Sequence, residues 1–483
     1  MKTLHVDVPG RGYPVMIGPG LVPSAGRLLA GLGWNSAPII VTNRTVFDLH
    51  GDSLVRSLGP AFGTPRVIRI GDGERFKNHA TLMRIYREMI GGITRRAEEL
   101  QVPGLVAEVE LLPPCTWNVG WGVDVSRVLL EMLAGFSSKT GIKTALRTTV
   151  IDVREGRGLE HMHRGKQWEN VIAAFRENAL AGADLLAIES IGGKETHDEA
   201  NMTCDIQKAI FALGILGVRD MHKLWGAIRQ VADETGSIAS GDTACGFANT
   251  AMVLAERRFI PKVFAAVDRV ISAVRSLAAV EAGAIGPHKD CGYEGIYVKA
   301  ITGIPIAMEG RSSAVAHPSP VGNIAACAAD LWSNESVQHI KLLGGYAPVV
   351  SMEQLAYDCR LMNGASGRGP DTARLLRDLH ADSDSMLDPQ AYVLRPDVVV
   401  AIAKQIVADT HGPFSRSKTA ARAAVEALRD GLAAGQLNLD SRETDWLDRI
   451  EDQLDQIPED EEAFIRAMID ETEKLKPAHY DLV

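Results

Sequence analysis

Residues 143–190 decide the fold. The strand-like run Lys143-Thr-Ala-Leu-Arg-Thr-Thr-Val150 is followed by a helical pattern over Trp168–Ala181 and then by the apolar run Asp184-Leu-Leu-Ala-Ile-Glu-Ser190. A strand, a helix and a second strand in this order are typical of parallel β/α structure, because parallel strands need a crossover connection. The segment therefore predicts an α/β fold with a parallel sheet.

The same rhythm extends on both sides of this segment. The further expected strands are Leu105–Glu110, Gly236–Gly241, Ser276–Glu281 and Ile304–Glu309, and the helices between them are Val125–Phe136, Met221–Thr235, Val263–Val274 and Tyr297–Thr302. Six strand–helix alternations either open into a doubly wound sheet or close into an eight-stranded barrel. No GxGxxG turn follows any of these strands, so we favour a (β/α)8 barrel of the TIM type.

The two ends of the chain follow other patterns. The first 83 residues predict a small Rossmann-like α/β segment, with a hairpin over Thr3–Val8 and Pro14–Ile17 and two buried strands at Pro38–Asn43 and Arg66–Ile70. From residue 386 onward the pattern is helical, and we expect a C-terminal helical region over 386–483 behind a barrel domain over 84–385. The acidic run Pro458-Glu-Asp-Glu-Glu predicts the solvent-exposed start of a helix.

Composition excludes several classes of protein. Of the 483 residues, 46% are hydrophobic and 23% are charged, which fits a folded protein of two or three units. The net charge of −10 disfavours nucleic-acid binding. No apolar run is long enough to span a membrane, and the first residues carry no signal-peptide pattern. The six cysteines include no CxxC pair, so we expect a reducing, cytoplasmic location without a disulfide framework.

Chemistry is expected where the strands end, because the reactive face of a β/α barrel lies at the carboxyl ends of its strands. Three successive predicted strands lead to Glu189, Cys245 and Cys291, which are 56 and 46 residues apart, about one β/α unit each. One carboxylate and two thiolates suit a zinc ion with an open fourth position, the pattern of a catalytic site. The alternative is that both cysteines are buried structural thiols and that Glu189 pairs with a base such as Lys194.

The sequence around these residues resembles the zinc subunit of the methanol:corrinoid methyltransferase family. The stretches that carry the resemblance are Ala187-Ile-Glu189-Ser-Ile-Gly-Gly-Lys-Glu, Ser240-Gly-Asp-Thr-Ala-Cys245-Gly-Phe-Ala-Asn-Thr-Ala-Met, Gly286-Pro-His-Lys-Asp-Cys291-Gly-Tyr-Glu and Asp330-Leu-Trp-Ser-Asn-Glu-Ser336. The resemblance covers about residues 84–483. It implies a β/α barrel with a helical addition and a zinc ion held by Glu189, Cys245 and Cys291.

The resemblance also implies the reaction and the partners. Zinc polarises the C–O bond of methanol, and cobalt(I) of a corrinoid on a partner protein takes the methyl group, which gives methyl-cobalt(III) and water. We expect a homodimer or a larger complex with the corrinoid-binding protein, no nucleic-acid partner and no membrane partner. A proton must reach the leaving oxygen, and Asp242 and Asp290 are candidate donors; alternatively they cap helices or bind backbone amides.

Other residues have ordinary interpretations. Cys204, Cys327 and Cys359 are expected to pack in the interior, His288 to lie in a surface loop, and His161 and His163 to form a loop pair without a site.

The first 80 residues resemble the N-terminal part of 3-dehydroquinate synthase, especially in Asp72-Gly-Glu-Arg-Phe-Lys77. The catalytic lysines and zinc-binding residues of that family are absent, so synthase activity is not expected. We expect the methyltransferase family's own N-terminal leader to be replaced by this segment. The alternatives to a methanol methyltransferase are therefore a fusion whose barrel is catalytically impaired and a related corrinoid methyltransferase that acts on another methylated substrate.

Overall fold

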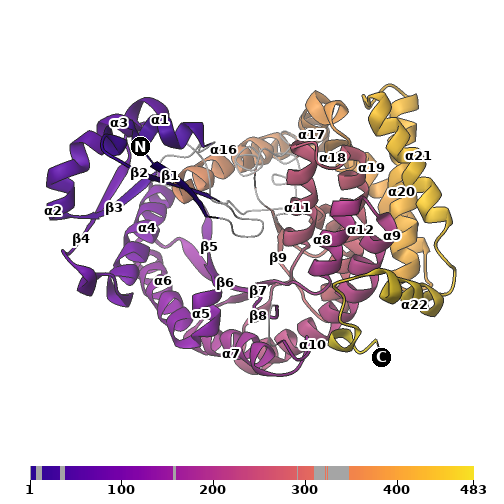
Figure 1. The fold of residues 1–483 in the computed structure, drawn as a ribbon, viewed down its shortest axis with the longest axis horizontal. Helices are drawn as coiled ribbons and strands as arrows, with labels where there is room; N and C mark the ends of the chain where they lie inside the picture. Colours follow the sequence, from indigo (N-terminus) through magenta and orange to yellow (C-terminus); the bar gives the residue numbers. More distant parts are fainter. Residues whose placement is uncertain are drawn as a thin grey trace.

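The computed structural model describes residues 2–6, 13–32, 38–155, 159–290, 292–308, 310, 321, 324 and 347–482. Cys291, Cys327 and the segment Asp330–Ser336 lie outside the described residues, and of Asp290 only the backbone is described. The central strands lie between a small N-terminal unit and a thick layer of helices (Figure 1).

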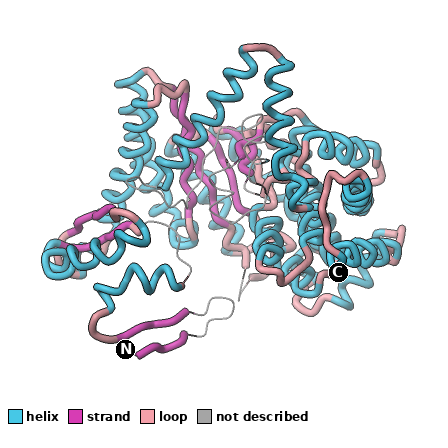
Figure 2. Tube along the Cα trace, turned by 90° about the horizontal axis from the view of Figure 1, so that it is seen from above, coloured by secondary structure: helices cyan, strands magenta, loops and turns pink. Residues whose placement is uncertain are grey.

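The N-terminal unit has the predicted α/β elements, but the predicted burial of the strand at 38–43 is wrong, because Ile39 and Val41 are exposed at the surface of this small unit. The elements are β1 (Lys2–Val6), β2 (Tyr13–Ile17), α1 (Leu21–Gly31), β3 (Ile39–Asn43), α2 (Arg44–Val46), η1 (Phe47–Gly51), α3 (Asp52–Phe62), β4 (Arg66–Ile70) and η2 (Glu74–Phe76). The first two strands form an antiparallel hairpin and the other two a parallel pair (Figure 2). Ile40, Leu58 and Phe62 are the buried core of this unit. The next helix, α4 (His79–Glu99), contains the predicted boundary between residues 83 and 84, which stays a prediction.

The central sheet is parallel, as residues 143–190 predict. Its strands, in spatial order, are β5 (Gly104–Leu111), β6 (Lys143–Ile151), β7 (Leu185–Glu189) and β8 (Ile238–Ala239). Beyond β8, the N–H of Ile285 donates to the carbonyl of Ala239 at 3.0 Å. The chain then enters β9 (His288–Asp290), which pairs in parallel with β10 (Ile306–Met308). The α/β class is therefore confirmed, whereas closure into an eight-stranded barrel stays a prediction.

Helices follow the strands along the chain. They are α5 (Pro113–Trp117), α6 (Val119–Thr140), α7 (Lys166–Ala181), α8 (Lys194–Thr203), α9 (Ile206–Ile210), η3 (Phe211–Gly217), α10 (Val218–Thr235), α11 (Cys245–Glu256), α12 (Lys262–Glu281) and α13 (Gly295–Thr302). Apolar residues between strands and helices form one large core.

One predicted strand is wrong. Residues 276–281 are the last turns of α12, and the strand that precedes Cys291 is β9. An apolar run of this length fits a buried helix as well as a buried strand, and Leu277, Ala278 and Ala279 are good helix formers that continue the helix without interruption. The correction leaves Cys291 directly after a strand that ends at Asp290.

The C-terminal region is helical, as predicted, although helices begin before residue 386. They are α16 (Ala347–Gly367), α17 (Pro370–Asp384), η4 (Ser385–Leu387), α18 (Pro389–Tyr392), α19 (Pro396–Ala408), α20 (Pro413–Ala433), α21 (Ser441–Asp455), α22 (Glu461–Glu471) and η5 (Pro477–Tyr480). The acidic run does start a helix, because the Asp460 carboxylate caps α22 by accepting from the N–H of Ala463 at 2.7 Å. Among the described helices, none is long and apolar enough to cross a membrane.

Candidate functional site

The loops that follow β7 and β8 are bonded to each other. Ser190 directly follows Glu189, and its N–H donates to Asp242 Oδ2 at 3.2 Å. The Ser190 hydroxyl donates to the same carboxylate oxygen. Asp242 lies three residues before Cys245, the first residue of α11. These bonds hold the chain beside Glu189 against the chain that leads to Cys245.

The loops that follow β8 and β9 also meet. The N–H of Ala244 donates to the buried carboxylate of Glu294. A side chain at Gly292 would come within 3.4 Å of the Ala244 carbonyl oxygen. Ala244 precedes Cys245, and Gly292 follows Cys291. The structure therefore brings together the described neighbours of all three expected ligands, although Cys291 itself lies outside the described residues.

The Glu189 carboxylate has a buried cationic partner. Lys289 of β9 is 3% exposed, and its Nζ lies 2.7 Å from Glu189 Oε1, 2.8 Å from Glu110 Oε1 and 3.1 Å from Glu108 Oε1. Burial opposes the charge of Lys289, but the three carboxylates outweigh it and hold the pKa of Lys289 well above its ordinary value. The alternative that Glu189 pairs with a base is confirmed for Lys289, whereas the example named for it, Lys194, pairs instead with Asp198 four residues later on α8.

Asp242 is the candidate proton donor whose side chain the structure describes. Its side chain is fully buried, and burial raises the pKa of Asp242 to about 7, although Arg275 and the bonds from Ser190 lower it. Its Oδ1 has no hydrogen-bond partner within the part of the chain that the structure describes. A buried carboxyl with this pKa can carry a proton near neutral pH.

Cys245 is buried, with 4% of its surface exposed, and its sulfur is joined in a disulfide. Zinc binds the thiolate, so this bond must be reduced before Cys245 can bind a metal. No group of three or more His, Cys, Asp or Glu side chains suited to a metal ion occurs among the residues described. Cys204 and Cys359 were expected to pack in the interior. In the structure Cys204 is buried and Cys359 is half-buried.

The prediction of a surface loop for His288 is wrong. His288 is fully buried in β9, and a side chain at Gly241 would collide with its ring. Burial lowers the pKa of His288 to about 3, so the ring is neutral. Its neighbours on the chain are polar, which is why the sequence around it resembles a loop.

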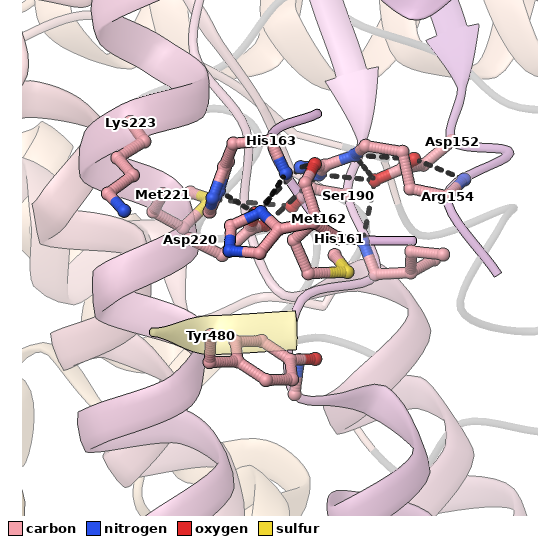
Figure 3. Close-up of polar contacts among 12 residues, drawn as sticks. Asp152, Arg154, His161, Met162, His163, Ser190, Asp220, Met221, Lys223 and Tyr480 are labelled. Carbon is pink, nitrogen blue, oxygen red and sulfur yellow. Dashed lines mark hydrogen bonds and ion pairs between the residues drawn. The ribbon is translucent and has the colours of Figure 1, made fainter. Parts of the chain in front are cut away.

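His161 and His163 do lie in a loop, and both bind carboxylates. His163 Nε2 lies 2.8 Å from Asp220 Oδ1 (Figure 3). His161 Nε2 lies 3.0 Å from Asp481 Oδ1. Asp220 also pairs with the buried Arg154, whose guanidinium bonds Asp152 directly after β6. The network also joins the ends of β6 and β7, because the N–H of Ile191 donates to Asp152 Oδ2 at 3.2 Å.

Several polar residues near the strand ends were not predicted from the sequence. They are Glu108, Glu110, Arg147, Arg154, Arg275 and Lys289. A usable signal was present for some of them, because charged residues inside apolar strands or helices are rarely buried without a partner. Arg147 within Lys143–Val150 and Glu108 within Leu105–Glu110 are examples.

Comparisons with known proteins identify the family of the chain. The family described as methanol-cobalamin methyltransferase B subunit matches residues 57–481. The methanol–corrinoid protein co-methyltransferase of Methanosarcina barkeri is 37% identical over 430 residues, which cover 88% of this chain and 92% of that relative. A crystal structure of the methanol:cobalamin methyltransferase complex from Methanosarcina barkeri matches with a TM-score of 0.78 and 34% identity over 92% of each chain.

A second, partial similarity is to 3-dehydroquinate synthases. The enzyme of Pelotomaculum thermopropionicum is 32% identical over 193 residues, 40% of this chain and 47% of that relative, so the chain spans about half the length of these proteins. The methyltransferase match begins at residue 57 and takes in most of the Methanosarcina barkeri relative. The match therefore begins before the predicted boundary at residue 84, and the replacement of the family's N-terminal leader stays a prediction.

Proposed function

Because the chain belongs to the methanol-cobalamin methyltransferase B subunit family, we propose that it transfers the methyl group of methanol to cobalt(I) of a corrinoid carried by a partner protein. The balanced reaction takes methanol, cobalt(I) and one proton to methyl-cobalt(III) and water. We propose that β5 to β10 belong to a closed eight-stranded barrel, and that the enzyme works in a complex with the corrinoid protein in the cytoplasm. The crystal structure of the complex from Methanosarcina barkeri supports this partner.

Glu189, Cys245 and Cys291 are the proposed zinc ligands. The observation that carries the proposal is that Ser190, Ala244 and Gly292, the neighbours of the three residues, lie in loops that contact one another. A carboxylate and two thiolates are donors that zinc prefers, and three protein ligands leave a position for substrate. Bound there, zinc would act as a Lewis acid on the oxygen of methanol and so weaken the C–O bond.

The chain's own residues then have separate tasks. Asp242 holds a proton near neutral pH and delivers it to the leaving oxygen, because its buried carboxyl has a pKa of about 7. The Ser190 hydroxyl donates to Oδ2 of Asp242 and so orients the carboxyl group. Lys289 neutralises the negative charge that Glu108, Glu110 and Glu189 concentrate inside the sheet. Asp290, at the end of β9, is the second candidate for proton transfer.

The experiment is a methyl-transfer assay without oxygen. Reduced, zinc-supplemented protein is mixed with cob(I)alamin and methanol, and the formation of methylcob(III)alamin is followed by its absorption spectrum. Wild type should methylate the corrinoid, and Cys204→Ala should match wild type. Glu189→Gln should lose at least about 100-fold in rate, because even residues that only orient metal ligands change activity by about 10–100-fold. Cys204 is a suitable control because it is buried but free.

The outcomes separate the alternatives. Methylation from a methylamine or a methoxylated aromatic compound, with none from methanol, would assign another substrate. Zinc uptake without transfer from any of these donors would mean that the barrel is catalytically impaired.

A further inference from the structure

Helix α12 has an unusual pattern of buried polar residues. Seventeen of its side chains are buried, and Asp268, Arg269, Ser272, Arg275 and Ser276 are fully enclosed among them. Their spacings of three and four residues place them along one side of the helix. Burying two guanidinium groups costs free energy unless each is paired, so their partners indicate what the helix does.

Three of these side chains lead to the three loops of the candidate site. Arg275 Nη2 donates to Ser190 Oγ at 2.7 Å and lies 3.4 Å from the Ser190 carbonyl oxygen. Ser276 Oγ donates at 3.2 Å to the Glu294 carboxylate oxygen that also accepts from the N–H of Ala244. Arg269 Nη1 donates to the carbonyl oxygen of Gly292.

Two of these contacts fall next to a proposed ligand in the sequence, and the contact of Ser276 reaches the neighbour of a third ligand through Glu294. Ser190 follows Glu189, Ala244 precedes Cys245 and Gly292 follows Cys291. Arg275 has a second contact with the same region, because its guanidinium lies 4.3 Å from the centre of the Phe247 ring on α11. Helix α12 thus contacts the loops of Glu189 and Cys291 one residue from each ligand, and it reaches Ala244, next to Cys245, through Glu294.

We propose that Arg269, Arg275 and Ser276 are positioning residues, through which α12 sets the relative placement of the three metal-ligand loops. The inference rests on the proposed zinc ligands. Three ligands on separate loops reach tetrahedral geometry only if the loops are held to within a fraction of an ångström, and a buried helix supplies such a common frame. Outer residues that orient metal ligands typically change metal affinity or activity by about 10–100-fold when they are replaced.

The chain offers a matched control on the same helix. Ser272 is also buried, but its hydroxyl donates to the carbonyl oxygen of Asp268 within α12. Ser276→Ala and Ser272→Ala therefore remove the same group from the same helix, and only the first removes a link to the site. Arg275→Met and Arg275→Lys form a second pair, in which lysine retains a donor for Ser190.

The readouts are zinc affinity and the absorption spectrum of the cobalt(II)-substituted protein, with circular dichroism as a check of folding. Reduced apoprotein is titrated with zinc in competition with a chelator. Arg275→Met and Ser276→Ala should weaken zinc binding by about 10–100-fold and alter the cobalt(II)–thiolate absorption bands. Arg275→Lys should recover part of the affinity, and Ser272→Ala should stay within about two-fold of wild type.

Folded Arg275→Met and Ser276→Ala proteins with the zinc affinity and cobalt spectrum of wild type would overturn the inference while leaving the ligand assignment intact. An equal loss in Ser272→Ala would also overturn it, because the effect would then reflect packing of the helix. If Arg275→Met does not fold, Ser276→Ala, which removes one oxygen atom, decides the question. If wild type itself binds no zinc, the proposed function fails first and the inference falls with it.

Discussion

Replacement of Arg154 by methionine tests the ion network behind the strand ends. Arg154 lies three residues after β6, and its guanidinium is fully buried between two buried carboxylates (Figure 3). It bonds Asp152 at 2.6 Å, Asp220 at 2.7 and 3.0 Å, and the carbonyl oxygen of Met162 at 3.0 Å. Methionine retains the length of the side chain and removes the charge and all of these donors.

The expected loss of stability is large because the carboxylates stay behind. Removing one partner of a buried ion pair typically costs about 3–5 kcal/mol. Both carboxylates here have no exposed surface, so solvent screening does not reduce this cost. We expect Arg154→Met to lower the free energy of unfolding by about 4 kcal/mol at pH 7.

The loss should depend on pH. Burial alone would raise the pKa of Asp220, but Arg154 and His163 outweigh it and hold that pKa well below its ordinary value. In wild type this contribution to stability is therefore present above about pH 4 and is lost only as the pH falls through the lowered pKa. In Arg154→Met the pKa of Asp220 rises, so the folded variant takes up a proton on Asp220 at a higher pH than wild type does. The difference between wild type and variant should shrink as the pH falls from 7 towards 5.

Urea unfolding followed by circular dichroism measures the effect at both pH values. Arg229→Met is the control, because Arg229 and its partner Asp233 have 40% and 60% of their side chains exposed. Exposed pairs contribute about 0–1 kcal/mol. A loss below about 1 kcal/mol in Arg154→Met, or a loss that grows at pH 5, would refute the reasoning.

Three further predictions concern the site itself. Cys291→Ala should lose bound zinc and methyl transfer together, and full retained activity would remove Cys291 from the ligand set. In wild type the transfer rate should fall as the pH rises through about 7, the pKa of Asp242; Asp242→Asn should lower the rate by about 10²–10⁴-fold and abolish this limb, and an unchanged pH–rate profile would contradict the assigned role. Lys289→Met should lower the free energy of unfolding of the metal-free protein by about 2–4 kcal/mol, whereas Lys139→Met, at an exposed pair with Glu98, should change it by less than about 1 kcal/mol. Equal losses in the two lysine variants would mean that the three carboxylates do not depend on Lys289.

The sequence predicted most of the regular elements because their patterns are local. The runs at Lys143–Val150 and Asp184–Ser190 are short and flank a helical pattern, which favours strands, and both are strands in the structure. The apolar stripe over Leu447, Ile450 and Leu454 likewise predicts one face of a helix, and all three residues are buried in α21. Local periodicity was sufficient at these positions.

The errors occur where tertiary contacts decide the structure. Leu277 and its neighbours form an apolar run that fits a strand or a helix, and in the structure they continue α12. His-Lys-Asp at 288–290 has the composition of a loop, but it forms a strand because it pairs with β10. The pairing of Glu189 with Lys289 joins residues 100 positions apart and has no local signal. The same holds for the contacts from α12 to the loops, although two arginines within an apolar helix were a visible hint.

The candidate ligands could be proposed from strand ends because the topology of β/α proteins fixes where those ends meet. Glu189 ends a described strand and Cys245 begins the helix after the next one, as expected. The carboxyl group of Asp242 could be placed near them from sequence spacing, but the rise of its pKa depends on complete burial, which spacing alone does not predict.

The zinc content of the reduced protein tests whether Glu189, Cys245 and Cys291 hold a metal ion. Wild type, Cys245→Ala and the control Cys204→Ala are purified under reducing conditions, which open the disulfide at Cys245, and zinc per chain is measured by elemental analysis. The assignment of Cys245 as a zinc ligand predicts about one zinc per chain in wild type and in Cys204→Ala, and almost none in Cys245→Ala. Well-folded wild type without zinc, or Cys245→Ala with as much zinc as wild type, would contradict it.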